Sequence, residues 1–388
     1  MFSSRTPADL APNALARALA STRARGAEVL DLTETNPTRA GLAASTEVLA
    51  PLASPASVAY DPHPFGLPGA REAVAADYGR AGLALSASQL VLTSSTSEAY
   101  SFLFKLLCDP GDEVLVPVPS YPLFDHLTRL DAVVPRPYPL EYHGTWSIDL
   151  EALERGVTSR TRAVLVVSPN NPTGSVLRRG DLDRLSGLAA SRGLAIVGDE
   201  VFADYPLEPA ADGCRVLDRE DALTFVLGGL SKSVGLPQLK LGWIAAGGPP
   251  PLRERALARL EVIADAYLSV STPVQQAAGP LLAAGRAVRQ AIAARVGSNL
   301  VRLREATASS PCSVLRVEGG WSAVLRVPAT RPEEALAIGL LEQDGVLVHP
   351  GYFFDFPREA YLVLSLLPDP AVFAEGVSRL IARLSSGF

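Results

Sequence analysis

The chain has 388 residues, more than twice the length of a typical single domain, so we expect it to form two lobes. Hydrophobic residues make up 48% of it and charged residues 20%, with 31 glycines and 32 prolines, a composition that excludes disordered, collagen-like and coiled-coil proteins. The formal charge of -6 offers no basic surface of the kind that binds nucleic acid, so no nucleic-acid partner is expected.

Cysteine and histidine are too sparse and scattered for a disulfide framework or a metal site. The three cysteines lack the C-x-x-C spacing of a metal pair, and the four histidines are isolated from one another. We therefore expect no metal and a reducing, cytoplasmic setting. The N-terminal stretch has no continuous apolar core like that of a signal peptide, and no later run approaches the ~20 apolar residues of a membrane span, so no membrane partner is expected.

Short apolar runs alternate with helical patterns from about residue 89 to residue 247. This alternation predicts βαβ units that build a mainly parallel sheet, and the runs are apolar enough for a sheet buried on both faces. Functional loops are then expected beyond the carboxyl ends of the strands. The predicted strands are QLVLT (89–93), EVLV (113–116), AVLVVS (163–168), LAIVGDE (194–200), LTFVLGG (223–229) and LGWIAAG (241–247).

The pattern changes after residue 247 to long helices rich in Ala, Leu and Arg, over about 252–308. One of these helices is expected to link the two lobes. The C-terminal stretch mixes strands with helices, which indicates a smaller α+β domain. We predict a large α/β domain over residues 46–255 and a small domain made of residues 1–45 and 256–388.

Lys232 is the first candidate for chemistry. It lies in SKSVGLPQLK, just after the apolar run LTFVLGG, and the only other lysines are Lys105 and Lys240. A lysine at a strand end is usually solvated, and this is one interpretation. At the carboxyl edge of a buried sheet, however, partial desolvation lowers the pKa of the amine, and such a lysine can form a Schiff base with an aldehyde cofactor.

Two polar residues follow other predicted strands. Asp199 ends the run LAIVGD, and Asn171 lies in SPNNPTG after AVLVVS. Asp and Asn-Pro are both common in turns, so a structural role explains each residue by itself. The functional alternative is that Asp199 holds a heteroaromatic nitrogen protonated and that the Asn171 amide donates to a phenolate oxygen.

Two further segments suit a phosphorylated ring. Ser95, Thr96 and Ser97 open the helix EAYSFLFKLL, so their hydroxyls and free amides lie at a helix N-terminus. Helix capping explains them, and a phosphate site is the alternative because the helix dipole favours a dianion. Tyr121, in PVPSYPLF, is either ordinary core or a rigid ring face for stacking.

These segments occur in an order and spacing that resembles a known family, the fold-type I, class I/II aminotransferases similar to aspartate and aromatic aminotransferases. The resemblance covers nearly the whole chain, with 28 residues from Asn171 to Asp199 and 33 from Asp199 to Lys232. The matching segments are YDPHPFGLPGAREAVAADY, TSSTSEA, PSYP, NNPTG, DEVF, SKSVGLPQLKLGW and HPGYFF.

The resemblance implies a fold-type I architecture, in which a large domain with a mainly parallel seven-stranded sheet carries a smaller α+β domain. It also implies pyridoxal 5'-phosphate as the cofactor. Lys232 would form the Schiff base, Asp199 would pair with the pyridine nitrogen and Asn171 would donate to the ring oxygen O3′. Tyr121 would stack on the ring.

The same resemblance assigns the phosphate to a group of side chains at the strand ends. These are Ser95, Thr96, Ser97, Ser231 and Lys240. Tyr60 matches a tyrosine that in relatives reaches the phosphate from the neighbouring subunit, so the resemblance implies a homodimer with composite sites.

Four positions depart from the pattern of the family. Phe202 stands where a tyrosine usually bonds O3′, and Gly229 replaces a frequent phosphate-binding serine. Lys240 replaces the usual arginine, so a point charge substitutes for a guanidinium fork. Val363 begins the stretch VLS where the family has Arg, any residue, Ser, so the customary clamp for the substrate α-carboxylate is missing.

A carboxylate in a partly desolvated pocket needs a cation or several N–H donors, and Val363 supplies neither. Either the substrate is an amine without a free α-carboxylate, or another arginine has taken over. Arg39 in ETNPTRAG and Arg358 in FPREAYLVLS are the candidates, and each is otherwise a solvated surface residue. We expect Arg39, with Asn36 and Trp321 lining the substrate pocket and an α-amino acid as substrate.

The predicted function is an aminotransferase of class EC 2.6.1.-, which moves an amino group from an amino acid to a 2-oxo acid by a ping-pong mechanism. Lys232 and Asp199 are its predicted catalytic residues. The alternative within the fold is a lyase or decarboxylase. A non-catalytic effector-binding module is an alternative of another class, but it would carry an N-terminal DNA-binding domain, for which there is no room before Leu32. A plain nucleotide-binding α/β protein is the last alternative.

Overall fold

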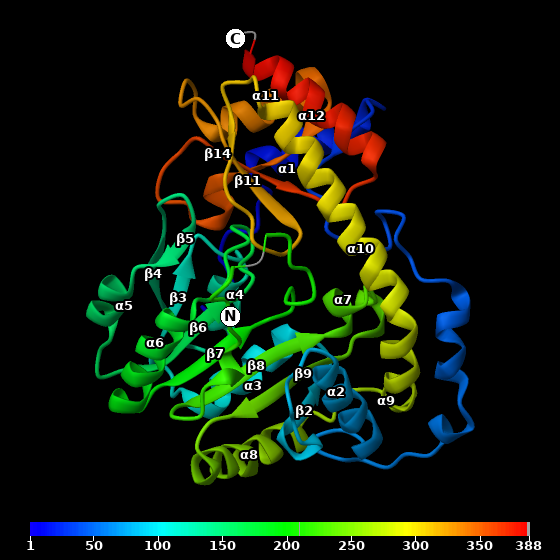
Figure 1. Ribbon diagram of the computed structural model, residues 1–388, viewed down its shortest axis with the longest axis vertical. Helices are drawn as coiled ribbons and strands as arrows, with labels where there is room; N and C mark the ends of the chain where they lie inside the picture. Colours follow the sequence, from blue (N-terminus) through cyan, green and yellow to red (C-terminus); the bar gives the residue numbers. More distant parts are fainter. Residues whose placement is uncertain (209, 386–388) are drawn as a thin grey trace.

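The computed structural model describes residues 1–208 and 210–385, and a large sheet lies at its centre (Figure 1). The strands of this sheet are β2 (Leu90–Thr93), β3 (Glu113–Val118), β4 (Val134–Tyr142), β5 (Trp146–Ile148), β6 (Thr161–Val167), β7 (Ala195–Asp199), β8 (Leu223–Gly229) and β9 (Gly242–Gly247). Their order is β2-β9-β8-β7-β6-β3-β4-β5. The pairs from β8 through β4 are parallel, whereas β9 runs antiparallel between β2 and β8.

The predicted α/β class with a mainly parallel sheet is confirmed, and the sheet has eight strands rather than seven. The six strands predicted from apolar runs lack β4 and β5, and β5 pairs antiparallel with β4 through Leu140–Ile148 and Tyr142–Trp146. A three-residue strand bounded by a tight turn gives too short an apolar pattern to be predicted from the sequence.

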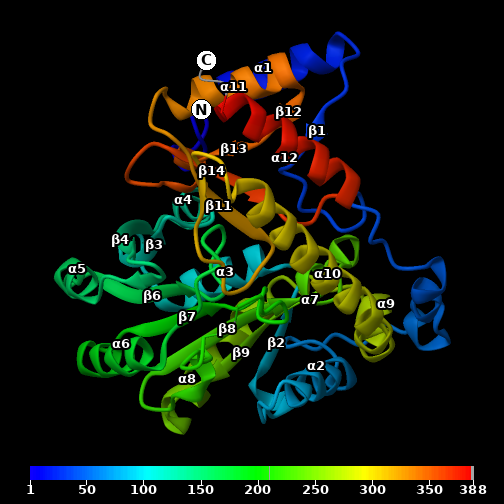
Figure 2. The same ribbon diagram turned by 45° about the horizontal axis from the view of Figure 1, so that its top comes forward.

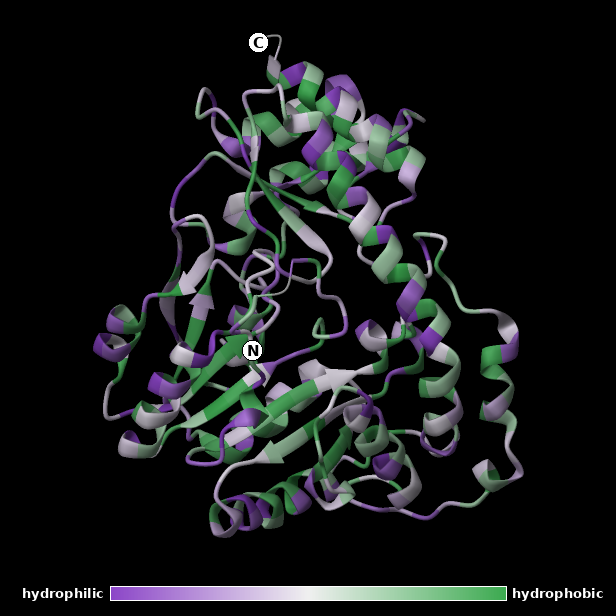
Figure 3. Ribbon diagram, in the orientation of Figure 1, coloured by the Kyte–Doolittle hydropathy of each residue, from purple (hydrophilic) through white to green (hydrophobic). Residues whose placement is uncertain are grey.

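Helices bury both faces of the sheet, which explains why its strands are continuously apolar. In β6, Val164 and Val166 face one layer, while Ala163, Leu165 and Val167 face the other. Hydrophobic residues accordingly fill the strands while the outer helix faces are polar (Figure 3). One layer contains α2 (Pro68–Arg80), α5 (Leu150–Gly156), α6 (Arg179–Arg192) and α9 (Thr272–Gln276), and the other contains α3 (Thr96–Leu107), α4 (Phe124–Leu130) and α8 (Pro250–Asp265).

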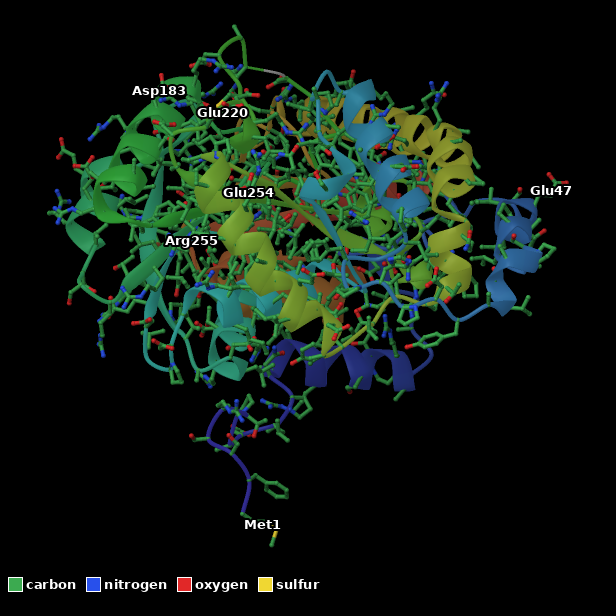
Figure 4. All side chains as sticks on the ribbon, turned by 90° about the horizontal axis from the view of Figure 1, so that it is seen from below. Met1, Glu47, Asp183, Glu220, Glu254 and Arg255 are labelled. Carbon is green, nitrogen blue, oxygen red and sulfur yellow. The ribbon has the colours of Figure 1, made fainter. Side chains whose placement is uncertain are left out.

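A second, smaller core lies above the large sheet (Figure 2). Its four-stranded sheet has the order β10-β11-β14-β13, and a separate parallel pair joins β1 to β12. The elements are α1 (Ala14–Ala24), β1 (Leu30–Asp31), β10 (Ser313–Val314), β11 (Ser322–Arg326), α11 (Glu333–Asp344), β12 (Val346–Leu347), β13 (His349–Pro350), β14 (Tyr361–Ser365) and α12 (Pro370–Ser385). The N-terminal segment before α1 extends away from the body and ends at Met1 (Figure 4).

One long helix, α10 (Ala278–Thr307), connects the two cores (Figure 1). Leu281 packs in the core of the large sheet, whereas Ile292 and Val296 pack in the small core. The predicted domain boundary at residue 255 falls inside α8, whose buried residues pack with α3 below the sheet. No helix in the described part of the chain is both long and apolar enough to cross a membrane.

Candidate active site

Three neighbouring strands, β6, β7 and β8, end at one cavity. Asp199 is the last residue of β7, Asn171 follows β6, and Lys232 lies in the short helix α7 (Leu230–Ser233) that follows β8. The cavity holds about 810 Å³ of empty space, part of it open to solvent, and all three residues line it. The other predicted residues that line it are Thr96, Ser97, Tyr121, Ser231 and Trp321.

The side chain of Lys232 is enclosed by aromatic rings. Its Nζ lies 5.0 Å from the centroid of the Trp321 ring and 5.6 Å from that of Phe202. Burial lowers the pKa of the Lys232 amine, and the nearby charge of Asp199 opposes this effect. A lowered pKa keeps more of the amine unprotonated near neutral pH, and only that form is a nucleophile or a base.

Asp199 is buried beside this lysine. One of its carboxylate oxygens accepts from the amide of Val201 at 3.2 Å and the other from the hydroxyl of Tyr100 at 3.1 Å. Burial raises the pKa of Asp199 to about 6, although both hydrogen bonds and the charge of Lys232 lower it. A carboxylate of this kind is ionised above that pH, so it can hold a proton on a ring nitrogen placed next to it.

The N-terminus of α3 opens into the cavity as an anion site. The Ser95 hydroxyl caps the helix by accepting from the Glu98 amide at 3.1 Å, so Ser95 has the capping role. The amides of Thr96 and Ser97 have no acceptor among the described residues, and both residues line the cavity. Free amides at the positive end of a helix dipole favour a phosphate.

Gly229 precedes α7 where the family often has serine, and the structure explains this departure. A Cβ at Gly229 would lie 3.1 Å from the Leu241 carbonyl oxygen and 3.3 Å from Gly242 Cα. Both of these atoms are backbone, which yields less readily than a side chain. A serine at this position would therefore require the backbone of Leu241 or Gly242 to shift by a few tenths of an ångström, which is consistent with glycine here.

Asn171 and Tyr121 complete the walls of the cavity. The Ser322 hydroxyl donates to Asn171 Oδ1 at 3.3 Å, which leaves the NH2 group of that amide free to donate. Tyr121 stands edge-on to Phe124, with ring centroids 6.3 Å apart and planes at 88°. Its side chain is partly exposed, so one ring surface is available for stacking.

Five predicted residues do not line this cavity in the single chain: Ser95, Lys240, Tyr60, Asn36 and Arg39. Lys240 is exposed, with a φ of 51°. Tyr60 is 78% exposed and borders a separate shallow pocket. Arg39 lies 4.0 Å from Glu34, and its side chain is 78% exposed. The proposed roles of these five residues remain predictions.

Val363, which stands where the family has the carboxylate-binding arginine, is buried by apolar packing. Val363 is 2% exposed in β14, between Val324 of β11 and His349 of β13. Burial lowers the pKa of His349, which keeps its imidazole neutral near pH 7. No arginine of the described residues lines the cavity, so Lys232 is its only lysine or arginine.

Sequence reasoning missed three polar residues of the cavity: Thr35, Tyr100 and Ser322. Tyr100 lies four residues after Thr96 on α3, so both lie on one helix face. This spacing could have identified Tyr100 as a cavity residue from the sequence. The contact of Ser322 with Asn171 joins residues 151 positions apart and leaves no local signal.

The arrangement defines a class of site: a buried lysine, a buried carboxylate and a helix N-terminus at the carboxyl edge of an α/β sheet. The sequence profile of the family described as aminotransferase class I and II matches residues 28–380. The chain therefore belongs to the class I and II aminotransferases. Within residues 1–208 and 210–385, no group of three or more His, Cys, Asp or Glu side chains could hold a metal ion.

Individual relatives support the same assignment. Glutamate-pyruvate aminotransferase of Escherichia coli (strain K12) is 26% identical over 373 residues, which cover 94% of this chain and 92% of that protein. Aspartate aminotransferase of Streptomyces avermitilis is 30% identical over 346 residues, covering 82% of this chain and 80% of that protein. The crystal structure of an aminotransferase from Escherichia coli matches with a TM-score of 0.88 at 25% identity, covering 100% of this chain and 98% of that chain.

The predictions of a pyridoxal-phosphate-dependent aminotransferase and of fold type I are thereby confirmed. The residues of the cavity fit the cofactor of this family. A buried amine suits its aldehyde, a buried carboxylate suits its ring nitrogen, and two free helix amides suit its phosphate.

Proposed function

We propose that Lys232 and Asp199 are the catalytic residues of this aminotransferase, and that it moves an amino group from an amino acid to a 2-oxo acid in two half-reactions at one site. One observation carries the proposal: the amine of Lys232 is buried beside a buried carboxylate, in a cavity that also receives free helix amides. The names of the relatives support alanine, glutamate and aspartate as donors.

Each residue of the cavity has a defined task. When bound, pyridoxal phosphate supplies an aldehyde that takes up amino groups and a ring that accepts electrons. Lys232 Nζ would take the proton from the α-carbon of the substrate, because burial lowers the pKa of its amine and so increases the fraction that can act as a base. Asp199 holds the proton of the ring nitrogen, and Asn171 donates to the ring oxygen.

The remaining residues bind and orient. Thr96, Ser97, Ser231 and Tyr121 line the cavity; the first three would hold the phosphate and Tyr121 would stack on the ring. Phe202 and Trp321 surround Lys232 Nζ with apolar surface, which excludes water from the proton transfer. Phe202 offers no hydroxyl to the ring oxygen, so Asn171 is the amide donor on that side.

A donor and acceptor screen tests the proposed function. The holoenzyme is mixed with L-alanine, L-glutamate or L-aspartate while its visible spectrum is recorded, and pyruvate or 2-oxoglutarate is then added. Loss of the visible band with the donor and its return with the oxo acid is the expected result. Release of ammonia, with no return of the band, would show a lyase instead.

We also propose that Arg39 binds the substrate carboxylate. Thr35 of the same loop lines the cavity, and no described arginine does. The Arg39 side chain is 78% exposed and its ion pair with Glu34 is 4.0 Å long, so little holds it away from the substrate. Arg39→Ala should lower kcat/KM for the best amino acid by about 2 kcal/mol, the scale of a lost charge-assisted hydrogen bond.

Arg358→Ala is the matched control for Arg39, because Arg358 is the other arginine predicted for this role and is exposed. Its kcat/KM should stay near the wild-type value. Unchanged kinetics in Arg39→Ala, or preference for an amine without a carboxylate, would remove Arg39 from the site.

The proposal includes a homodimer in a reducing, cytoplasmic setting. Tyr60 is exposed, as a residue that completes a neighbouring site needs to be before assembly. The three cysteines are free, which suits a reducing compartment. A sedimentation mass of a single chain for the active enzyme would contradict the composite site.

A further inference from the structure

The backbone around Lys232 is held by side chains outside the cavity. Helix α7 is only four residues long, so the carbonyls of Lys232 and Ser233 at its end have no helical partner. The single hydroxyl hydrogen of Tyr205 is shared between the Lys232 carbonyl, at 2.6 Å, and the Ser233 carbonyl, at 3.1 Å. Arg289 Nε donates to the Ser233 carbonyl at 3.0 Å. Two side chains thus satisfy two buried carbonyls next to the catalytic lysine.

A buried ion-pair network fixes Arg289 in this position. Arg289 is 7% exposed, and its guanidinium pairs with Asp77 of α2 and with Asp204, each at 3.3 Å. The Ser233 hydroxyl donates to Asp204 at 2.8 Å and accepts from Arg289 Nη2 at 2.8 Å. Arg80 also pairs with Asp77 and Asp204, so two guanidinium groups face two carboxylates, and their mutual attraction offsets part of the cost of desolvating Arg289.

Tyr205 and Arg289 reach α7 from different parts of the fold. Tyr205 follows β7 by six residues, its ring lies 5.1 Å from that of Trp321, and its carbonyl accepts from the Gly320 amide at 2.9 Å. Arg289 lies within α10, the helix that runs between the large and small cores (Figure 1). The backbone of Lys232 is therefore braced from the sheet, the small domain and the connecting helix.

We propose that Tyr205 and Arg289 are positioning residues for Lys232, which hold the α7 carbonyls so that the lysine amine stays in the cavity between Phe202, Trp321 and Asp199. The proposal rests on the catalytic role of Lys232 given above. No hydrogen bond fixes Lys232 Nζ to a described side chain, so its place depends on the backbone that carries it.

If the α7 backbone is held less firmly, the Lys232 amine becomes more exposed to solvent and its pKa rises. The charged groups around α7 are Asp199 on the cavity side and Asp77, Arg80, Glu200, Asp204, Arg215 and Arg289 on the other. Tyr205→Phe changes none of these charges and keeps the ring against Trp321. Any change in the titration of Lys232 in this variant therefore reports a change in the position of its amine relative to solvent.

The test is competitive acetylation of the apoprotein with acetic anhydride over a range of pH, with each lysine followed by peptide mass spectrometry. The chain has only three lysines, so Lys105 and the exposed Lys240 serve as internal references. In Tyr205→Phe, the pKa of Lys232 should rise by about 0.5–1. At a pH below this pKa, the unprotonated fraction of the amine then falls about three- to ten-fold. The references should not change.

Tyr138→Phe is the matched control, since Tyr138 is also buried and donates to a backbone carbonyl, that of Leu165, at 2.7 Å. It should lower thermal stability without moving the Lys232 titration. If Tyr205→Phe does not fold, Arg289→Lys replaces it, because lysine keeps the charge but loses the guanidinium fork that bonds Ser233.

The outcomes separate the two proposals. A Lys232 titration that is the same in Tyr205→Phe, Arg289→Lys and wild type overturns the positioning role, even if stability falls. Borohydride treatment of the wild-type holoenzyme that fixes the cofactor on another residue overturns the role of Lys232 itself.

Discussion

Lys232→Ala should lower turnover of an amino acid by about 10²- to 10⁴-fold, the usual contribution of a general acid–base group. The expected cause is the loss of the one buried amine in the cavity, which no neighbouring side chain can replace, since Lys105 and Lys240 do not line it. Stopped-flow measurement of the donor half-reaction gives the effect directly, without a contribution from the second substrate.

Lys105→Ala is the control for a change in lysine content. Lys105 donates to Ser101 and Asp131 at the surface of α3, away from the cavity. The donor half-reaction of Lys105→Ala should therefore run at the wild-type rate. A donor half-reaction in Lys232→Ala within a few-fold of the wild-type rate would remove Lys232 from the mechanism.

Asp199→Asn should lower turnover and raise the stability of the apoprotein at the same time. A neutral amide cannot hold the ring-nitrogen proton as a carboxylate does, and the loss of a hydrogen bond to a charged group corresponds to a fall in kcat of about 10- to 100-fold. Steady-state kinetics with a saturating donor and acceptor measure this fall.

The gain in stability follows from the raised pKa of Asp199. Burial brings this pKa to about 6 from the ordinary 3.8, so the folded state binds the proton more tightly than the unfolded chain. The resulting loss of folding free energy is absent below the ordinary pKa of 3.8 and grows as the pH rises from there to about 6. Above that pH it stays at about 3 kcal/mol.

Urea unfolding of the apoprotein at about pH 8 and about pH 4 measures this loss. Asp199→Asn should be more stable than the wild type at the higher pH and equal to it at the lower. Asp112→Asn is the control, because Asp112 is equally buried but is paired with Arg162 at 2.9 Å, so it should gain nothing. Equal stability of Asp199→Asn and wild type at both pH values would contradict the burial argument.

The sequence was sufficient to predict the parts of the site that depend on a single strand end. Lys232, Asp199 and Asn171 each follow a continuous apolar run, and the carboxyl ends of parallel strands meet at one edge of the sheet. Thr96 and Ser97 were predictable for a similar reason, because a helix N-terminus leaves its first amides unpaired.

Contacts between distant segments could not be predicted. Tyr100 and Asp199 are 99 positions apart, and Arg289 and Ser233 are 56 apart, so only the folded chain brings them together. For Arg39, the sequence predicted the loop but could not predict the direction of the side chain. Its loop does border the cavity through Thr35, but which side chain of a loop turns inward depends on backbone angles that the residue types do not determine.

The most direct test of the whole account is to reduce the purified holoenzyme with borohydride and map the labelled peptide. Borohydride makes the bond between an amine and the cofactor permanent, and three lysines make the assignment unambiguous. We predict a yellow protein that loses its colour on reduction and carries the whole label on Lys232. Label on Lys105 or Lys240, or a protein that takes up no label, would contradict the account.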